Sequence, residues 1–306
     1  MRIAFIKTIE NLAEKNKNIT LLTGDLGFTV FENFQKKFPN RFFNLGVAES
    51  NMMAMAAGMA LCGQIPIVYS IATFASLRPY EFIRNDICYQ NANVKIIGVG
   101  GGFGYGLAGI SHINIEDLAI MRFLPNLVIL CPADPIEAEI LTKQAIKHKG
   151  PVYLRLGKTN EPKLHSSRPN LKISKGFIMQ PGKEVAIFTT GGILDNVLQA
   201  SKILKTKNII PTIVNFHTIK PLDINLIKKL SKQHKYIFTV EEHSVTGGLG
   251  SAVAEVLSES DLKVKFKRLG VSRNNLKIVG DQSFLRNRYG LSAQKISSTI
   301  KKMILK

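Results

Sequence analysis

The chain has 306 residues, 45% of them hydrophobic, and a formal net charge of +19 from 41 Lys and Arg against 22 Asp and Glu. This length and apolar content predict about two folded domains and exclude a mostly disordered chain. Three Cys residues without a Cys-x-x-Cys pair exclude a disulfide scaffold and a structural zinc cluster. The N-terminus lacks the apolar core of a signal peptide, and the longest apolar stretch, 52–62, is too short to span a bilayer. We therefore expect a cytoplasmic protein without a membrane segment.

The positive charge is concentrated in the second half of the chain. Residues 1–160 carry 16 Lys and Arg against 12 Asp and Glu, whereas residues 161–306 carry 25 against 10. A basic half can indicate a nucleic-acid surface, but the Lys residues are scattered and no basic run alternates with stacking aromatics. We interpret the charge as a solvated, Lys-rich surface and expect no nucleic-acid partner.

Short apolar, β-branched runs alternate with helical patterns through the first 160 residues. The expected strands are 19–22, 42–45, 65–70, 94–99, 127–130 and 152–154, and the expected helices are 3–15, 49–62, 79–90, 116–123 and 135–147. Strands that are apolar throughout and separated by helices indicate a parallel sheet covered on both faces.

Residues 159–182 interrupt this alternation with loop compositions rich in Pro, Asn and Ser. The alternation then resumes with expected strands at 185–189, 209–214, 236–240 and 264–269. We therefore predict the α/β class, with two parallel-sheet domains at 1–160 and 183–306 and a linker at 161–182.

A carboxylate stands at the start of an unusually apolar helix pattern. Residues 44–58 contain a strand end, a turn at Gly46 and an Ala- and Met-rich helix with Glu49 in its first turn. The helix macrodipole alone favours Glu at such a position. Because the helix is apolar on most sides, however, we expect it to be buried, and a desolvated carboxylate needs a partner or a function.

A glycine-rich loop follows the expected strand at 94–99. Six of the ten residues 100–109 are Gly, which indicates a backbone that approaches another group closely. The loop contains a Gly-x-Gly-x-x-Gly sequence, but no helix begins at its third Gly, so we do not interpret it as a dinucleotide site. His112 at the end of the loop is a candidate acid–base or anion-binding group, although a single loop His is more often structural.

Two further segments allow both a functional and a structural interpretation. Phe74 and Arg78 follow a strand and could support a flat ring or hold an anion, but the segment also fits a strand that leads into an amphipathic helix. Residues 241–252 combine a strand, glycines and a helix start, which could bind an anion. Close packing of the helix on the sheet explains those glycines equally well.

The order and spacing of these segments resemble the pyrimidine-binding and C-terminal domains of the transketolase family of thiamine-diphosphate enzymes. The resemblance covers nearly the whole chain. It rests on Gly-Val-Ala-Glu-Ser-Asn at 46–51, the glycine-rich loop ending in Ser-His, Cys-Pro-Ala-Asp at 131–134, and Glu-Glu-His followed by Gly-Gly-Leu-Gly at 241–250. It implies a thiamine-diphosphate-binding, pyrimidine-type domain followed by a transketolase C-terminal-like domain.

The resemblance also implies that this chain is one half of a split enzyme. In the family, another domain holds the cofactor's diphosphate and its Mg2+ (or Ca2+) with a Gly-Asp-Gly motif followed by Asn. Here Gly24-Asp25-Leu26-Gly27 lacks the second Gly in register. A separate N-terminal subunit carrying the Gly-Asp-Gly…Asn site is therefore implied, in an α2β2 assembly by analogy, and no metal ligand is expected in this chain.

The resemblance assigns Glu49 to the carboxylate that hydrogen-bonds the aminopyrimidine ring of the cofactor. Such a carboxylate favours the imino tautomer, whose exocyclic nitrogen takes the thiazolium proton. Three other residues match the family's pocket around the pyrimidine, namely Phe74, Leu77 and Tyr80. Asp25 matches an acidic residue near the cofactor. Leu77 departs from the aromatic residue of the family.

The resemblance assigns the substrate to a second group of residues. His112 matches a substrate-contacting, catalytic His, and Thr29 stands where a phosphate-binding hydroxyl is expected; Arg78 is a further candidate substrate ligand. Lys158 replaces an Arg of the family and keeps the charge without the bidentate fork. Ala108 and Gly100 replace an Asp that reads donor hydroxyls and a phosphate-binding His.

These departures imply an altered substrate pocket beside an intact cofactor apparatus. The pattern resembles transketolase halves associated with unusual sugars, so sugars or sugar phosphates are the expected substrates and two-carbon ketol transfer the expected reaction. Two alternatives stay open. One is the beta subunit of a 2-oxoacid dehydrogenase or decarboxylase, and the other is a non-catalytic module that retains the fold.

Overall fold

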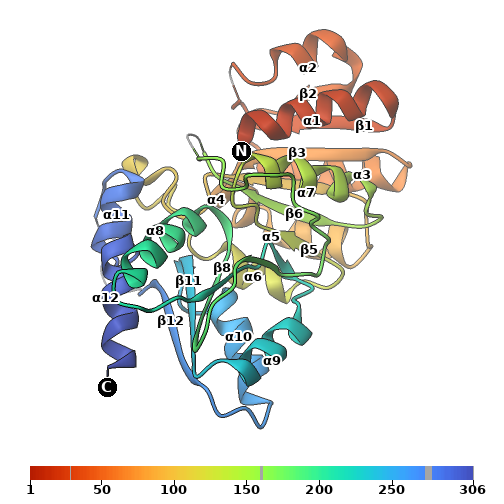
Figure 1. Ribbon diagram of the computed structural model, residues 1–306. Helices are drawn as coiled ribbons and strands as arrows, with labels where there is room; N and C mark the ends of the chain where they lie inside the picture. The colour runs from red at the N-terminus through yellow and green to blue at the C-terminus, as the bar shows by residue number, and fades with distance from the viewer. Residues whose placement is uncertain (28, 159–160, 273–277, 306) are drawn as a thin grey trace.

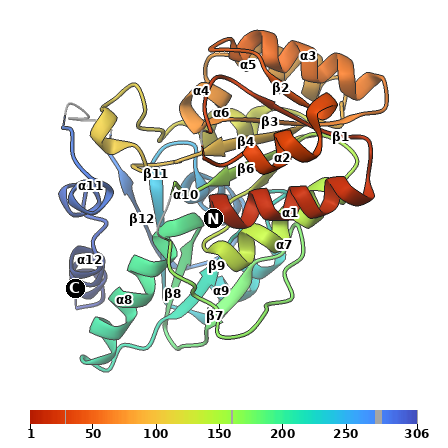
Figure 2. The same ribbon diagram turned by 90° about the horizontal axis from the view of Figure 1, so that it is seen from above.

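Two β-sheets organise the chain, which the computed structural model describes over residues 1–27, 29–158, 161–272 and 278–305. In Figure 1 most elements of the first unit, red to yellow-green, lie at the upper right, and those of the second, green to blue, lie at the left and bottom. The N-terminus lies near the junction of the two units, whereas the C-terminus lies at the far end of the second (Figures 1 and 2). No helix in the described ranges has the length and apolarity needed to cross a bilayer.

The first sheet has seven strands in the order β10-β5-β6-β4-β3-β1-β2. They are β1 (Ile19–Thr23), β2 (Phe42–Asn44), β3 (Ile65–Ile71), β4 (Lys95–Val99), β5 (Val128–Leu130), β6 (Val152–Leu156) and β10 (Thr218–Lys220). All neighbouring strands are parallel except β10, which pairs antiparallel with β5. The carboxyl ends of β1, β3, β4 and β6 therefore meet along one edge of the sheet.

Helices cover both faces of the first sheet because successive strand residues point to opposite sides. The helical elements are α1 (Arg2–Lys15), α2 (Glu32–Lys37), η1 (Pro39–Arg41), α3 (Glu49–Leu61), α4 (Ala72–Ser76), α5 (Tyr80–Phe82), η2 (Ile83–Cys88), η3 (Gly106–Ala108), α6 (Asp117–Phe123) and α7 (Pro135–Lys147). Leu21 of β1 belongs to the core cluster that includes α1 and α7, whereas Leu22 belongs to the cluster that includes α3 and α6.

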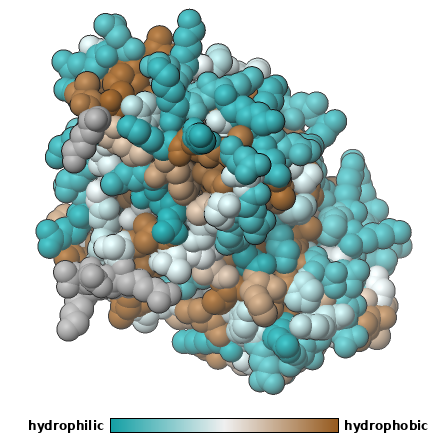
Figure 3. Space-filling model, turned by 90° about the horizontal axis from the view of Figure 1, so that it is seen from below, coloured by the Kyte–Doolittle hydropathy of each residue, from teal (hydrophilic) through white to brown (hydrophobic). Residues whose placement is uncertain are grey.

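The second sheet has five strands in the order β12-β11-β8-β9-β7. They are β7 (Phe177–Gln180), β8 (Val185–Thr189), β9 (Thr212–Asn215), β11 (Tyr236–Ser244) and β12 (Lys265–Val271), with η4 (Gly191–Ile193), α8 (Leu194–Lys205), α9 (Ile224–Gln233), α10 (Leu249–Ser258), α11 (Gln282–Arg288) and α12 (Ala293–Ile304). Figure 3, seen from the end that this unit occupies, shows a mostly hydrophilic face with small, separate hydrophobic patches.

The predicted α/β class is confirmed, with three differences in detail. Each sheet is mixed rather than wholly parallel, since β10 and β7 pair antiparallel with their neighbours. Strand β10 comes from the second unit yet completes the first sheet, and β7 lies within the segment predicted as a linker. The helix expected at 79–90 is divided into α5 and the π-helical η2, because π-type hydrogen bonds leave no trace in a 3.6-residue period.

A buried glutamate joins the two units. Glu137 of α7 accepts two hydrogen bonds from the Asn215 amide at the end of β9, at 2.8 and 2.9 Å. Its Oε1 also lies 2.7 Å from Nε2 of His165, a residue of the connecting segment. Burial alone lowers the pKa of His165, but the hydrogen bond and charge of Glu137 outweigh burial and raise it. The two units and their connection thus share one carboxylate.

We expect this pair to make the stability of the chain depend on pH. Because the folded pKa of His165 lies above its unfolded value, its contribution is complete below about pH 6.5 and is lost as the pH rises through the folded value. The free energy of unfolding of the wild type should therefore fall relative to that of His165→Gln between about pH 6 and pH 8, measured by urea denaturation.

His148 provides the matched control for this measurement. Burial and the nearby Lys95 charge lower the pKa of His148, so the wild type should gain stability relative to His148→Gln as the pH rises toward about 6.5, with the sign opposite to that for His165. A pH-independent difference between the wild type and His165→Gln would contradict the assignment.

Candidate active site

The candidate site lies where the carboxyl ends of β1, β3, β4 and β6 meet. In parallel α/β sheets this edge is where ligands bind, because loops of neighbouring strands converge there. Glu49 follows the turn after β2 as the first residue of α3, and its side chain is 2% exposed. Its Oε2 forms an ion pair with Arg78 Nη1 at 3.0 Å. Its Oε1 has the Ser70 hydroxyl at 3.5 Å as its only hydrogen-bond contact among the described residues, so it has capacity for a closer donor.

A row of rings and charges extends from Glu49 to His112. The Arg78 guanidinium lies over the Phe74 ring, 4.1 Å from its centroid. The Phe74 and His112 rings meet edge to face with centroids 5.0 Å apart. The Thr73 hydroxyl donates to the His112 carbonyl at 3.2 Å, which fixes the end of the glycine-rich loop against α4. The fold thus brings together Glu49 at the start of α3, Phe74 and Arg78 in and just after α4, and His112 of the glycine-rich loop.

Basic side chains surround Tyr105 at the other end of this row. Lys158 Nζ lies 4.4 Å from the centroid of the Tyr105 ring, and the His112 ring lies 6.2 Å away. Lys158 has no ion-pair partner among the described residues. Burial raises the pKa of the Tyr105 hydroxyl, and the charge of Arg2 opposes this rise. The surroundings of Tyr105 are therefore electropositive and suit an anionic group.

Tyr105 explains why residue 100 is Gly. Gly100 has a φ of +75°, and a Cβ at this position would lie 2.2 Å from the Tyr105 ring. The ring therefore fills the space that a side chain at residue 100 needs. Sequence reasoning missed Tyr105 and Arg2 as site residues. The glycine-rich loop pointed to Tyr105, but nothing in the sequence singled out Arg2.

Asp25 and Thr29 lie after β1 with left-handed backbones, at φ of +54° and +65°. The Asp25 N–H donates to Asn44 Oδ1 at 2.9 Å, and Asn44 Nδ2 donates back to the Asp25 carboxylate at 3.4 Å. A Cβ at the neighbouring Gly24 would lie 3.1 Å from the Gly46 carbonyl oxygen and in ordinary contact with Glu49 Oε1 at 3.8 Å, so this turn lies directly beside Glu49. Asp25 is thus adjacent to the Glu49 pocket, whereas the Thr29 N–H is bonded to Glu32 at the start of α2.

Leu77 and Tyr80 occupy different environments. Leu77 is 42% exposed and precedes Arg78 on the open side of the site. Tyr80 packs against the core cluster that includes α3 and α6, and its hydroxyl donates to the Ile120 carbonyl at 3.0 Å. The hydroxyl of Tyr80 therefore serves the packing of α5 on α6.

The helix start at 248–250 binds an internal carboxylate. Glu241, 1% exposed, accepts hydrogen bonds from the N–H groups of Leu249 and Gly250 at 2.8 and 2.7 Å. The N-terminus of α10 is therefore satisfied by the chain itself, which favours the structural alternative for this segment over an anion site.

Comparisons with known proteins agree with this architecture. Family models described as the transketolase pyrimidine binding domain and the transketolase C-terminal domain match residues 1–163 and 174–296. A putative transketolase C-terminal section of Methanocaldococcus jannaschii is 39% identical over 98% of this chain and 95% of that protein. One of the subunits of an apulose-4-phosphate transketolase, from Actinobacillus succinogenes, is 34% identical over 86% of this chain and 85% of that protein. A solved structure described as an inactive beta4 tetramer of a split gene transketolase is 38% identical, with a TM-score of 0.88 over 98% of this chain and 97% of that chain.

The contact between residue 100 and Tyr105 can be tested by substitution. Gly100→Ala should cost about 1–2 kcal/mol for a left-handed non-Gly backbone and about 1–3 kcal/mol more for displacing the Tyr105 ring. Gly63→Ala is the matched control, since Gly63 has a φ of +84° with nothing within 4 Å of a Cβ. Urea denaturation of both variants, and of Gly100→Ala with Tyr105→Ala, separates the two costs. Equal destabilisation by Gly100→Ala and Gly63→Ala would exclude the ring contact.

Proposed function

Because the chain belongs to the transketolase family, we propose that it is the pyrimidine-binding subunit of a two-component, thiamine-diphosphate-dependent transketolase. The proposed reaction transfers a two-carbon ketol unit from a ketose to an aldose-type acceptor. The observation that carries the proposal is the carboxylate of Glu49, which is 2% exposed at the start of an apolar helix and keeps one oxygen without a short hydrogen bond.

The residues of this chain fit the aminopyrimidine half of the cofactor. Glu49 Oε1 can meet a ring nitrogen, and Phe74 lies one side chain away along the row, bridged by Arg78. When bound, thiamine diphosphate supplies a carbon nucleophile for attack on a carbonyl. Glu49 holds a proton at the pyrimidine ring nitrogen, and its burial keeps water from competing for that position. His112 is placed to exchange a proton with the substrate at the other end of the row.

The second half of the cofactor needs a partner. Among the described residues no group of three or more His, Cys, Asp or Glu could hold a metal ion. We assign the diphosphate and the Mg2+ (or Ca2+) to a separate N-terminal subunit with the Gly-Asp-Gly…Asn site, because Gly24-Asp25-Leu26-Gly27 lacks the second Gly of that motif in register. The inactive beta4 tetramer named for the similar solved structure supports a chain that assembles with itself but lacks activity alone. We propose α2β2 for the active enzyme.

Exposed apolar side chains flank the site and support an interface there. Val47 is 67% exposed and precedes Glu49 by two residues, and Leu107 and Ile110 are 72% and 57% exposed on the glycine-rich loop. Large apolar side chains at a site edge are typical of surfaces that a partner covers. The proposed active site is therefore completed when the partner subunit packs on this edge.

The substrate end is proposed to take a sugar or sugar phosphate. Lys158, Arg2 and His112 surround Tyr105 with positive charge or hydrogen-bond donors. Lys158 supplies a point charge where the guanidinium of the family's Arg would bind a phosphate through two hydrogen bonds. This difference suits a substrate whose anionic group lies in a different position from the phosphate of ordinary sugar-phosphate donors. The phosphorylated substrate named for the Actinobacillus succinogenes relative supports this class, and the proposal extends to a role in unusual-sugar biosynthesis.

Substitution of Glu49 tests the proposed reaction. Glu49→Gln should lower ketol transfer at least about 100-fold, the usual contribution of a positioned proton-transfer group, without lowering the melting temperature. The assay uses the chain reconstituted with the Gly-Asp-Gly…Asn subunit and a panel of ketoses and aldehydes. Pyruvate is tested separately, because release of CO2 from it would indicate a 2-oxoacid decarboxylase. Glu81→Gln, at an exposed carboxylate on α5, is the control. Near-normal turnover of Glu49→Gln would refute the assignment.

Cofactor binding tests the division between subunits. The isolated chain should bind thiamine diphosphate with Mg2+ at least about 100-fold more weakly than the reconstituted pair, because the ligands of the diphosphate are absent from it. Isothermal titration calorimetry compares the two. Tight binding to the isolated chain would contradict the split-site proposal.

A further inference from the structure

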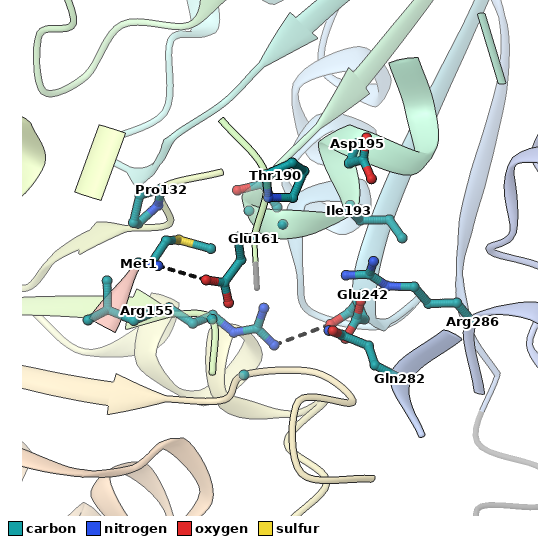
Figure 4. A pocket seen from close by; sticks show the side chains of 16 residues that line it. Met1, Pro132, Arg155, Glu161, Thr190, Ile193, Asp195, Glu242, Gln282 and Arg286 are labelled. Carbon is teal, nitrogen blue, oxygen red and sulfur yellow. Dashed lines mark hydrogen bonds and ion pairs between the residues drawn. The ribbon is translucent and has the colours of Figure 1, made fainter. Parts of the chain in front are cut away.

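A polar pocket of about 140 Å3 lies between the two units, directly behind the glycine-rich loop. The first unit lines it with Gly101 and Arg155 among others, and the second with Glu242, Gln282 and Arg286. Figure 4 shows Arg155 reaching toward Glu242 from one side and the Arg286 guanidinium lying on the other. Glu242 is therefore at the centre of the contact between the units.

The Glu242 carboxylate reaches from the second unit into the backbone of the loop. It is 5% exposed, and its Oε1 accepts a hydrogen bond from the Phe103 N–H at 2.6 Å. The same oxygen accepts from Gln282 Nε2 at 2.8 Å, and Oε2 pairs with the Arg286 guanidinium. Arg286 is itself held by Asn196 Oδ1 at 2.9 Å. Two groups of the second unit thus hold the carboxylate that receives the loop, and a third, Asn196, holds Arg286.

The loop is shaped to receive this carboxylate. Gly102 has a φ of +73°, and a Cβ there would lie 2.4 Å from Glu242 Oε1. Gly102 also exchanges two backbone hydrogen bonds with Asn114, at 2.6 and 3.0 Å. The segment between Phe103 and Asn114 is therefore closed at its base, next to Glu242.

Hydrogen bonds from Arg155 of β6 hold the same end of the glycine-rich loop, at Asn114. Arg155 Nη2 donates to the carbonyls of Asn114 and Glu242, at 3.0 and 3.2 Å. Tyr105 lies two residues after Phe103, and His112 lies two residues before Asn114. Tyr105 and His112 thus lie on a segment that is held at both ends. The Glu242 carboxylate holds the Phe103 end, and Arg155, which also binds the Glu242 carbonyl, holds the Asn114 end.

We propose that Glu242 is a positioning residue through which the second domain sets the conformation of the active-site loop, and with it the placement of Tyr105 and His112. The inference rests on the proposed function for its effect on catalysis, but not for its effect on the loop. Loss of the carboxylate leaves the Phe103 N–H, on a residue that is 0% exposed, without an acceptor and removes a charge-assisted bond.

Hydrogen exchange of the full chain tests the effect on the loop without any partner. Glu242→Leu should speed amide exchange across residues 102–115 by about tenfold or more, the equivalent of one lost charge-assisted hydrogen bond. Glu242→Gln retains an oxygen for the Phe103 N–H and should speed it less. Glu241→Gln is the matched control, because Glu241 is the adjacent buried carboxylate on β11 and bonds α10 rather than the loop.

Unchanged exchange in the loop of either Glu242 variant would overturn the proposal. So would uniform acceleration of the second unit with no excess in 102–115, because that pattern marks a purely structural ion pair. Should Glu242→Leu fail to fold, the comparison of Glu242→Gln with Glu241→Gln still decides the outcome.

Kinetics of the reconstituted enzyme test the consequence for the reaction. Glu242→Leu should raise the substrate KM and lower kcat while leaving the affinity for thiamine diphosphate unchanged, because Glu49 and Phe74 lie on other elements. Partial recovery in Glu242→Gln is expected. Equal losses in Glu241→Gln would refute a positioning role. An inactive wild-type pair would count against the proposed function alone, since the exchange result stands independently of it.

Discussion

The buried ion pair between Arg155 and Asp117 is the interaction around which both sheets are arranged. Asp117 is 0% exposed, and its Oδ2 accepts from Arg155 Nε and from the Tyr153 hydroxyl, each at 2.7 Å. Burial opposes the charge on Arg155, but Asp117 more than compensates and raises the pKa of the guanidinium. Removing one partner of such a pair typically costs about 3–5 kcal/mol, since a buried charge is left alone. The pair fixes the guanidinium whose remaining donors bridge Asn114 and Glu242, so the loop and the second unit both depend on it.

This constraint explains why the site can be rigid although most of its residues stand on loops. Glu49 starts a helix whose apolar side chains are buried, and His112 is held through Thr73. Glycines with positive φ let the loop pass close to Tyr105 and Glu242 where any side chain would clash. A preorganised site of this kind binds without first ordering its loops, which lowers the entropic cost of binding. The described residues nevertheless provide only one side of the proposed cofactor site. The fixed loops would therefore form a preorganised surface on which the partner subunit packs.

The sequence predicted the parts of this structure that follow from local patterns. Strands β1, β3 and β4 are continuous apolar runs, and each lies within two residues of its predicted bounds. The burial of Glu49 was predicted from the apolar helix that it begins, and the structure confirms it, whereas its role in a site stays a prediction that rests on the conflict between a carboxylate and an apolar helix. The antiparallel strand β10 could not be predicted, because three residues with no apolar run acquire their pairing only from the fold. The same holds for Tyr105 and Arg2, since the Arg2 charge acts on the Tyr105 hydroxyl although the two are distant in sequence. It holds as well for Glu241, whose role depends on α10 folding back on β11.

The position of the second unit gives it more than a packing role. Its strand β10 extends the first sheet, Asn215 binds the same carboxylate as His165, and Glu242 enters the base of the glycine-rich loop. Three separate contacts of this kind over-determine the placement of the two units, since each pairs polar groups of one unit with groups of the other away from water. Residues 161–306 contain 25 Lys and Arg against 10 Asp and Glu. Most of these charged residues lie outside the three contacts, which use only a few charged side chains. The net charge of the second unit is therefore a property of its surface, whereas its influence on the active site passes through individual buried groups.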